Sequence, residues 1–192
     1  MPKSILDAGT VVITRRHGLT LTAATLPAIL LAACGTPTPM TPAQIVTQAG
    51  AAASGLAGMV KQLSVAYPTL IPAATLTQIG TYLGLAQTAA SNLAPNLPAT
   101  TGASFVHVIE GYLNAVLTML AGPPINGLIP APFNMALSAV SMILPQLEAF
   151  AAIYIPAAAA SPAVTKARMT FAAAAPVRPE DAVAVLQSFA GK

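Results

Sequence analysis

His107 and Glu110 are the residue pair whose types and spacing come nearest to a site for chemistry. They stand three positions apart, so in a helix they lie on one face. Such a pair can supply two metal ligands, but a tetrahedral zinc site needs three or four. After Cys34 the chain has one histidine and four acidic residues, two of them near its end. We therefore expect no metal site and no cofactor, and a hydrogen-bonded pair on a polar helix face.

Two catalytic arrangements can be tested against the same few residues. A serine hydrolase needs a nucleophile, a base and an orienting acid, and here only His107 and Asp181 would be available as base and acid. Glu110 and Glu148 could pair as catalytic carboxylates across two helices, but their faces look solvated. The sequence has no nucleophile-elbow motif, phosphate loop or dinucleotide fingerprint. These patterns predict a protein that is not an enzyme.

The single cysteine, Cys34, lies in a different setting. Residues 1–17 form a basic segment that ends in Arg15-Arg16-His17, and Gly18 to Ala33 is an uncharged apolar stretch. A membrane-spanning helix needs about 20 residues, more than this stretch supplies. The segment therefore fits a signal peptide better than a permanent span.

The apolar stretch ends in Leu31-Ala32-Ala33-Cys34, which resembles the lipobox of bacterial lipoproteins. The resemblance implies that the thiol of Cys34 receives a diacylglyceryl group and that a peptidase cuts between Ala33 and Cys34. It also implies that the new amino group is often acylated. Two or three acyl chains on one residue suffice for stable membrane anchoring. The alternative is ordinary signal-peptide cleavage or a retained anchor, with Cys34 as an incidental thiol.

Two further features bear on export and location. The segment from Thr14 to Leu19 looks like a twin-arginine export signal, although a plain basic region explains it equally well. Gly35, directly after the cysteine, resembles the default for outer-membrane sorting in bacteria that have two membranes. We therefore expect a location in the cell envelope, in the outer membrane facing the periplasm.

The composition excludes some partners. Charged residues make up 7% of the chain, far below the roughly 25% usual for soluble domains. After Cys34 there are five basic and four acidic residues, a net charge of 5 − 4 = +1, with no basic stripe. We therefore expect no nucleic-acid partner. One cysteine allows no internal disulfide.

The remainder of the sequence has helical periodicity. Four runs of apolar residues recur at three- to four-residue steps, separated by proline-rich joints. This pattern predicts an all-α fold, an antiparallel bundle of about four amphipathic helices with one or two short C-terminal helices. The expected organisation is a signal peptide at 1–33, the lipidated cysteine and a Pro/Thr tether at 34–41, the bundle at 42–156 and a charged helical tail at 157–192. The four apolar stripes are Ile45, Ala49, Ala52, Leu56, Met59, Leu63 and Tyr67; Leu76, Ile79, Leu83, Ala86, Ala90 and Leu93; Phe105, Ile109, Tyr112, Val116 and Leu120; and Phe133, Leu137, Val140, Leu144, Leu147 and Tyr154.

Local signals refine the helix boundaries. Thr41-Pro42-Ala43-Gln44 predicts an N-cap with a capping box, and Pro68 predicts the end of the first helix. Pro145 predicts a kink or a break in the fourth helix. Ser161-Pro162 predicts a short helix through about Ala173.

The charged tail is expected to be the solvated, partner-facing part of the chain. Its first short helix should expose Lys166 and Arg168. Arg178-Pro179-Glu180-Asp181 should open a final helix, with its acidic residues in the first turn, where they suit the helix dipole.

Small residues also recur at four-residue steps. Gly80 and Gly84 form one such pair, and Gly50, Ser54 and Gly58 form a longer run. Within a membrane such spacing would indicate close helix contacts. We favour alanine-rich, closely packed helices outside the bilayer as the explanation.

These features predict a non-catalytic, lipid-anchored envelope protein that acts by protein or membrane-surface interaction. Its partners would be membrane lipid, through acylated Cys34, and an envelope protein. One alternative is a carrier of small apolar ligands, whose cavity would be lined by Met59, Met119, Met135 and Met142. A second is an integral pore-forming or lysis-type protein, with segments 104–121 and 133–155 in the bilayer.

Overall fold

The computed structural model describes residues 40–97, 100–125, 127–155 and 161–191, and within these ranges the chain contains helices and no strand. This confirms the predicted all-α class. The predicted signal peptide, the lipobox and Cys34 lie outside the described residues.

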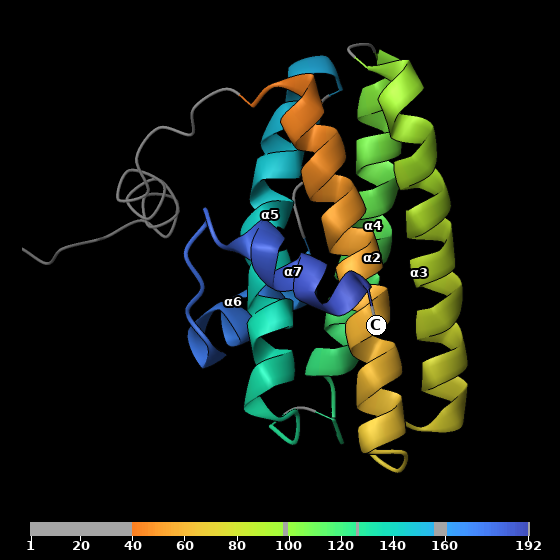
Figure 1. Ribbon diagram of the computed structural model, residues 1–192, viewed down its shortest axis with the longest axis vertical. Helices are drawn as coiled ribbons and strands as arrows, with labels where there is room; N and C mark the ends of the chain where they lie inside the picture. The colour runs from red at the N-terminus through yellow and green to blue at the C-terminus, as the bar shows by residue number, and fades with distance from the viewer. Residues whose placement is uncertain (1–39, 98–99, 126, 156–160, 192) are drawn as a thin grey trace, which may run out of the picture. The chain divides into compact units, whose positions relative to one another are not determined.

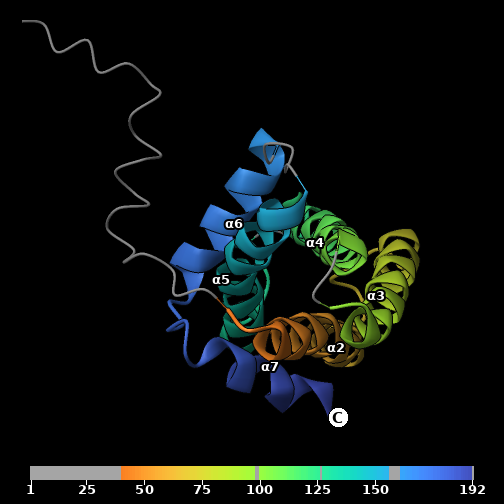
Figure 2. The ribbon, with the colours of Figure 1, turned by 90° about the horizontal axis from the view of Figure 1, so that it is seen from above.

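Four long helices form the body of the molecule: α2 (Pro42–Ala66), α3 (Ala73–Leu93), α4 (Thr100–Ala121) and α5 (Ala131–Tyr154). Consecutive helices run in opposite directions (Figure 1). Each packs against the next, and α5 returns to pack against α2, which closes the ring seen from above in Figure 2. The predicted antiparallel four-helix bundle is therefore confirmed. A short 3₁₀ turn, η1 (Ala94–Asn96), follows α3.

The first helix begins as the capping signal predicts. The Thr41 hydroxyl accepts a hydrogen bond from the backbone N–H of Gln44, and the Gln44 side chain accepts one in return from the backbone N–H of Thr41. This reciprocal pair satisfies two N–H groups that a helix start leaves unpaired. α2 ends at Ala66, just before Pro68.

Most members of the predicted apolar stripes are buried in the core between the helices. Two members at helix ends are exposed instead: Tyr67 is 45% exposed and Tyr154 is 39% exposed. Of the kink or break predicted at Pro145, the break was wrong, since α5 is one continuous helix, and the kink stays a prediction. Pro145 lies on the exposed side of α5, where its ring meets water.

Two shorter helices pack against the bundle. α6 (Pro162–Ala174) begins at Ser161, whose hydroxyl accepts from the backbone N–H of Val164, and it packs against α4 and α5. α7 (Ala182–Ala190) packs against α2 and α5, and crosses them in Figure 1. The acidic residues expected in the first turn of this last helix instead precede it, with Asp181 at the N-cap position.

Candidate functional site

Arg168, on the inner side of α6, is the centre of a buried charged cluster. Its side chain is only 12% exposed, between the buried apolar residues Ala167 and Phe171 of the same helix. The expectation that Arg168 is exposed was therefore wrong, because α6 lies against α4 and α5 and turns this side chain into the bundle. Lys166, two positions earlier, is exposed as expected.

The guanidinium group of Arg168 holds Glu148 of α5 by two parallel hydrogen bonds. Its Nη1 and Nη2 atoms donate to Oε2 and Oε1 of Glu148 at 2.9 and 2.7 Å. Such fork-to-fork pairing is stronger and more directional than a single charged contact. It ties α6 to α5.

The same guanidinium group reaches α4. Its Nε atom donates to Oδ1 of Asn114 at 2.9 Å, and Nη2 approaches Oε1 of Glu110 at 3.4 Å. Asn114 in turn donates to Oε1 of Glu110 at 3.1 Å, and Nδ1 of His107 lies 3.3 Å from Oε2 of Glu110. These five residues, His107, Glu110, Asn114, Glu148 and Arg168, are called the Arg168 cluster below.

The two carboxyl groups of the cluster have opposite pKa shifts. Burial raises the pKa of Glu110 to about 7, and the neighbouring Glu148 adds to the effect, while His107 and Arg168 oppose it. Burial alone would also raise the pKa of Glu148, but the hydrogen bonds and the charge of Arg168 outweigh it and hold this pKa below its ordinary value. Near neutral pH the cluster therefore holds one ionised carboxylate and one carboxyl group that is partly protonated.

The structure places the predicted site residues as follows. His107 and Glu110 do pair, as expected, and Glu110 and Glu148 do come together across two helices. Their faces are only partly solvated, because α6 covers them: Glu110 is 9% exposed, whereas the side chains of His107 and Glu148 are half-buried. Asp181 precedes α7, which packs against α2 and α5, whereas His107 lies on α4. Among the described residues, no group of three or more His, Cys, Asp or Glu side chains could hold a metal ion.

An acidic group with a raised pKa beside an ionised carboxylate is a pattern that acid–base enzymes use. In the Arg168 cluster, however, the hydrogen bonds of Glu148 go to Arg168 and those of Glu110 go to its neighbours within the cluster. Two surface hollows on the described part of the chain, one on α6 and one beside α2 and α7, are lined by no cluster residue. The geometry suits the clamping of three helices better than the binding of a substrate.

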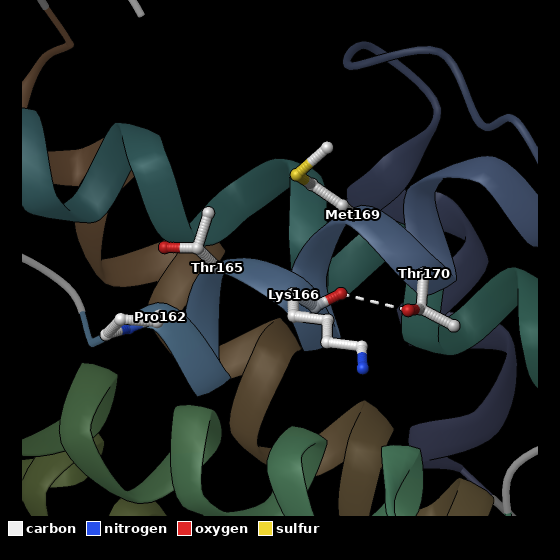
Figure 3. Close-up of a pocket in the computed structure, with 5 residues that line it drawn as sticks. All are labelled: Pro162, Thr165, Lys166, Met169 and Thr170. Carbon is white, nitrogen blue, oxygen red and sulfur yellow. Dashed lines mark hydrogen bonds between the residues drawn. The ribbon is translucent and has the colours of Figure 1, made fainter. Parts of the chain in front are cut away.

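The larger hollow is an open depression on the outer face of α6. Figure 3 shows the side chains that line it: Pro162, Thr165, Lys166, Met169 and Thr170. None of the methionines expected to line a carrier cavity lines this depression. Of those, Met59 is fully buried in the core and Met135 is 45% exposed.

Two helices meet the length and composition expected of a membrane span. These are α4 and α5, whose most apolar windows have mean hydropathies of 1.3 and 1.6. Within the bundle, 50% and 61% of these windows are buried. The core helices of a bundle outside a membrane have the same properties, so this finding is weak evidence for insertion.

One end of the bundle, where the α2–α3 and α4–α5 connections lie (Figure 1), has four of the nine exposed large apolar side chains of the described residues. Val65 is 77% exposed and Leu128 is 62% exposed. The ring of Tyr67 packs edge-on against Phe133 of α5 at a centroid distance of 6.3 Å, so the end of α2 and the start of α5 are neighbours. We call Val65, Tyr67, Leu128 and Met135 the apolar end. α2 begins at the opposite end of the bundle.

The fold and the cluster together define an all-α protein: an antiparallel four-helix bundle with two accessory helices, one of which is clamped by a buried arginine. No protein-family model matches the chain, and the curated proteins and solved structures give no match either.

The sequence correctly placed His107 and Glu110 on one helix face but did not show what covers that face. The available signal was the polar stripe itself. In a chain with so few charges, two glutamates on neighbouring helices need a cationic partner, and Lys166 and Arg168 are the first two cations that follow them along the chain.

Proposed function

We propose that this chain is a non-catalytic lipoprotein of the bacterial cell envelope, held on the membrane by acylated Cys34, which acts through its folded domain by binding. The observation that carries the proposal is the segment Leu31-Ala32-Ala33-Cys34 at the end of an uncharged apolar stretch. An ordered helix begins at Pro42, only eight residues after Cys34, which leaves a short tether.

The side chains that could take part in acid–base chemistry also support a binding role. Glu110, Glu148 and Arg168 are engaged with one another, and they are engaged in holding helices together. The outer surface has few charges, which lowers solubility. Low solubility matters less for a protein that is tethered to a membrane than for one that must stay dispersed in solution. The apolar end, which lies away from the start of α2, is the part of the described surface best suited to contact a partner.

The anchor is tested by fractionation of the full chain and its Cys34→Ala variant in a bacterial host with lipoprotein processing. We expect the parent chain to sediment with membranes, to resist carbonate extraction and to incorporate labelled palmitate. The variant should incorporate no label. A Thr36→Ala variant, changed just after the motif, is the matched control and should behave as the parent does. Equal labelling of parent and Cys34→Ala would refute acylation at this residue.

The same experiment separates the anchor from an integral pore. If α4 and α5 crossed the bilayer, enzymatic removal of the acyl chains would leave the protein in the membrane. A tethered bundle should instead be released. Release therefore supports the proposal, and retention after complete deacylation supports the pore-forming alternative.

Binding through the apolar end is tested by photo-crosslinking in the same host. A crosslinker is placed at Leu128, in the apolar end, or at Leu85, a 43% exposed residue on α3 that serves as control. We expect a discrete protein or lipid adduct from position 128 and none from position 85. Equal adducts at the two positions, or none at 128, would contradict a role for this end.

A further inference from the structure

α6 is attached to the bundle by few apolar contacts. The helix has 13 residues, of which Ala167 and Phe171 are the two that are buried. The segment 175–181 that joins it to α7 contains no helix and is largely exposed. Burial of two side chains, one of them only a methyl group, supplies little stabilisation, so the docking of α6 depends strongly on Arg168.

With a neutral His107, the charges around Arg168 do not balance when both carboxyl groups are ionised. α4 presents Glu110 and His107, α5 presents Glu148, and α6 itself presents Arg168. α3, which packs on the other side of α4, has no charged residue. α2, which also packs against α4 and α5, has one, Lys61, and both Lys61 and Lys166 are exposed to solvent. One guanidinium ion therefore faces two carboxyl groups. With Glu110 protonated the Arg168–Glu148 pair is neutral, and with Glu110 ionised the buried cluster has one surplus negative charge.

We propose that α6 is a proton-sensitive helix, which docks firmly when Glu110 is protonated and loosens when Glu110 ionises. An ionised Glu110 beneath α6 has little access to water and shares Arg168 with Glu148, whose bonds to the guanidinium group, at 2.9 and 2.7 Å, are shorter than the 3.4 Å contact of Glu110. When α6 leaves, both carboxylates regain water. Ionisation therefore favours the undocked arrangement.

The direction of the response follows from linkage. In the docked state the pKa of Glu110 is raised from 4.5 to about 7, chiefly by burial, and undocking returns it toward 4.5. The docked state thus binds the proton more tightly, so docking is favoured fully below pH about 4.5 and loses this contribution as pH rises through about 7. For one proton with these two pKa values, the docking equilibrium should fall roughly 30-fold between pH 5.5 and pH 8.

The test is amide hydrogen exchange of the full chain at pH values from 5.5 to 8, corrected for the intrinsic pH dependence of exchange. We expect the protection of residues 162–174 to fall by a factor of ten or more over this range, while that of α3 stays constant. Glu110→Gln, a neutral isostere of the protonated side chain, should keep α6 protected at every pH. Lys166→Gln, an exposed change on the same helix, should respond as the parent chain does.

Two more variants test whether Glu110, and not a neighbouring group, determines the pH response of α6. Glu148→Gln frees Arg168 for Glu110, so the loss of protection should move to lower pH. His107→Gln should leave the response in place; loss of the response in this variant would assign it to the histidine and overturn the proposal. A pH-independent α6 in the parent chain, or an unchanged response in Glu110→Gln, would also overturn it.

Discussion

Among the described residues, Arg168 donates more side-chain hydrogen bonds than any other side chain. It gives up water for four hydrogen bonds that reach α4 and α5. Removal of one partner from a buried ion pair is costly because the other partners are left uncompensated. The guanidinium group therefore stabilises the fold because, without it, two carboxyl groups would lie beneath a helix with no cation to compensate them.

The first prediction concerns this side chain. Arg168→Met should lower the free energy of unfolding by about 3 kcal/mol, the size expected for a broken buried pair. Arg168→Lys should recover only part of the loss, because an ammonium group cannot make the forked contact with Glu148. Urea denaturation monitored by circular dichroism measures both. Lys166→Met, exposed on the same helix, should change stability by less than about 0.5 kcal/mol, and an equal loss there would count against the cluster.

The second prediction is a stability maximum at mildly acidic pH. Glu148 has a lowered pKa, so its contribution is present above its ordinary value of 4.5 and is lost as pH falls below it. Glu110 has a raised pKa, so its contribution is present below 4.5 and is lost as pH rises through about 7. Stability should therefore be greatest near pH 5.

Urea midpoints measured from pH 3 to pH 9 check this prediction. In Glu110→Gln the urea midpoint should no longer fall above pH 5 but should still fall at acidic pH. In Glu148→Gln the fall of the urea midpoint at acidic pH should be lost. A parent profile that rises steadily from pH 5 to pH 8 would show that the sign assigned to Glu110 is wrong.

Part of this cluster could be predicted from the sequence. The spacing of His107, Glu110 and Asn114 places them on one face of a helix, and the pairing of the first two is local. The role of Arg168 could not be predicted, because it lies 58 residues after Glu110 and meets it only through the packing of α6. Helical period identifies a polar face but does not say whether water or another helix covers it.

At the scale of elements, α7 depends on two glycines of α2. A methyl group on Gly55 would lie 2.6 Å from the carbonyl oxygen of Leu186, and one on Gly58 would collide with the carbonyl oxygen of Phe189. Both contacts involve the α7 backbone, which cannot turn aside as a flexible side chain can. The expected small-residue run on α2 thus serves helix packing at Gly58, whereas Gly80 and Gly84 of α3 face open space.

The third prediction uses this contrast. Gly58→Ala should lower the free energy of unfolding by about 1–3 kcal/mol through overpacking and should weaken the protection of α7 from hydrogen exchange. Gly80→Ala, at an open helical position, should raise stability by about 0.5–1 kcal/mol, because alanine is the better helix former. If both changes stabilise the chain, α7 does not pack on α2 as described.

The four long helices could be predicted because their signals are local. Thr41 and Gln44 form the expected capping box, and each apolar stripe repeats with helical period. The break expected at Pro145 failed for a non-local reason. A missing N–H costs one hydrogen bond, and packing of the buried side chains on both sides of Pro145, such as Leu144 and Leu147, can hold α5 together despite this loss.

At the scale of the whole molecule, charged residues are few, and those after Cys34 lie almost entirely in the second half of the chain. Glu110, Glu148 and Arg168 form the buried cluster, and Lys61 is the single charged residue between Met40 and Leu97. A surface so poor in charge is more readily tolerated by a protein that is confined to a membrane than by one at high free concentration. The proposed anchor therefore fits the low charge content of the chain, and the apolar end, which lies away from the start of α2, fits a surface that contacts a partner.

Intact mass spectrometry of the protein purified from its native host tests the central claim most directly. Lipid attachment at Cys34 predicts a chain that begins at Cys34, lacks residues 1–33 and carries the added mass of a diacylglyceryl group, with or without a third acyl chain. Fragmentation should place the added mass on the first residue. An unmodified Cys34, or a chain that retains the residues before it, would contradict the account.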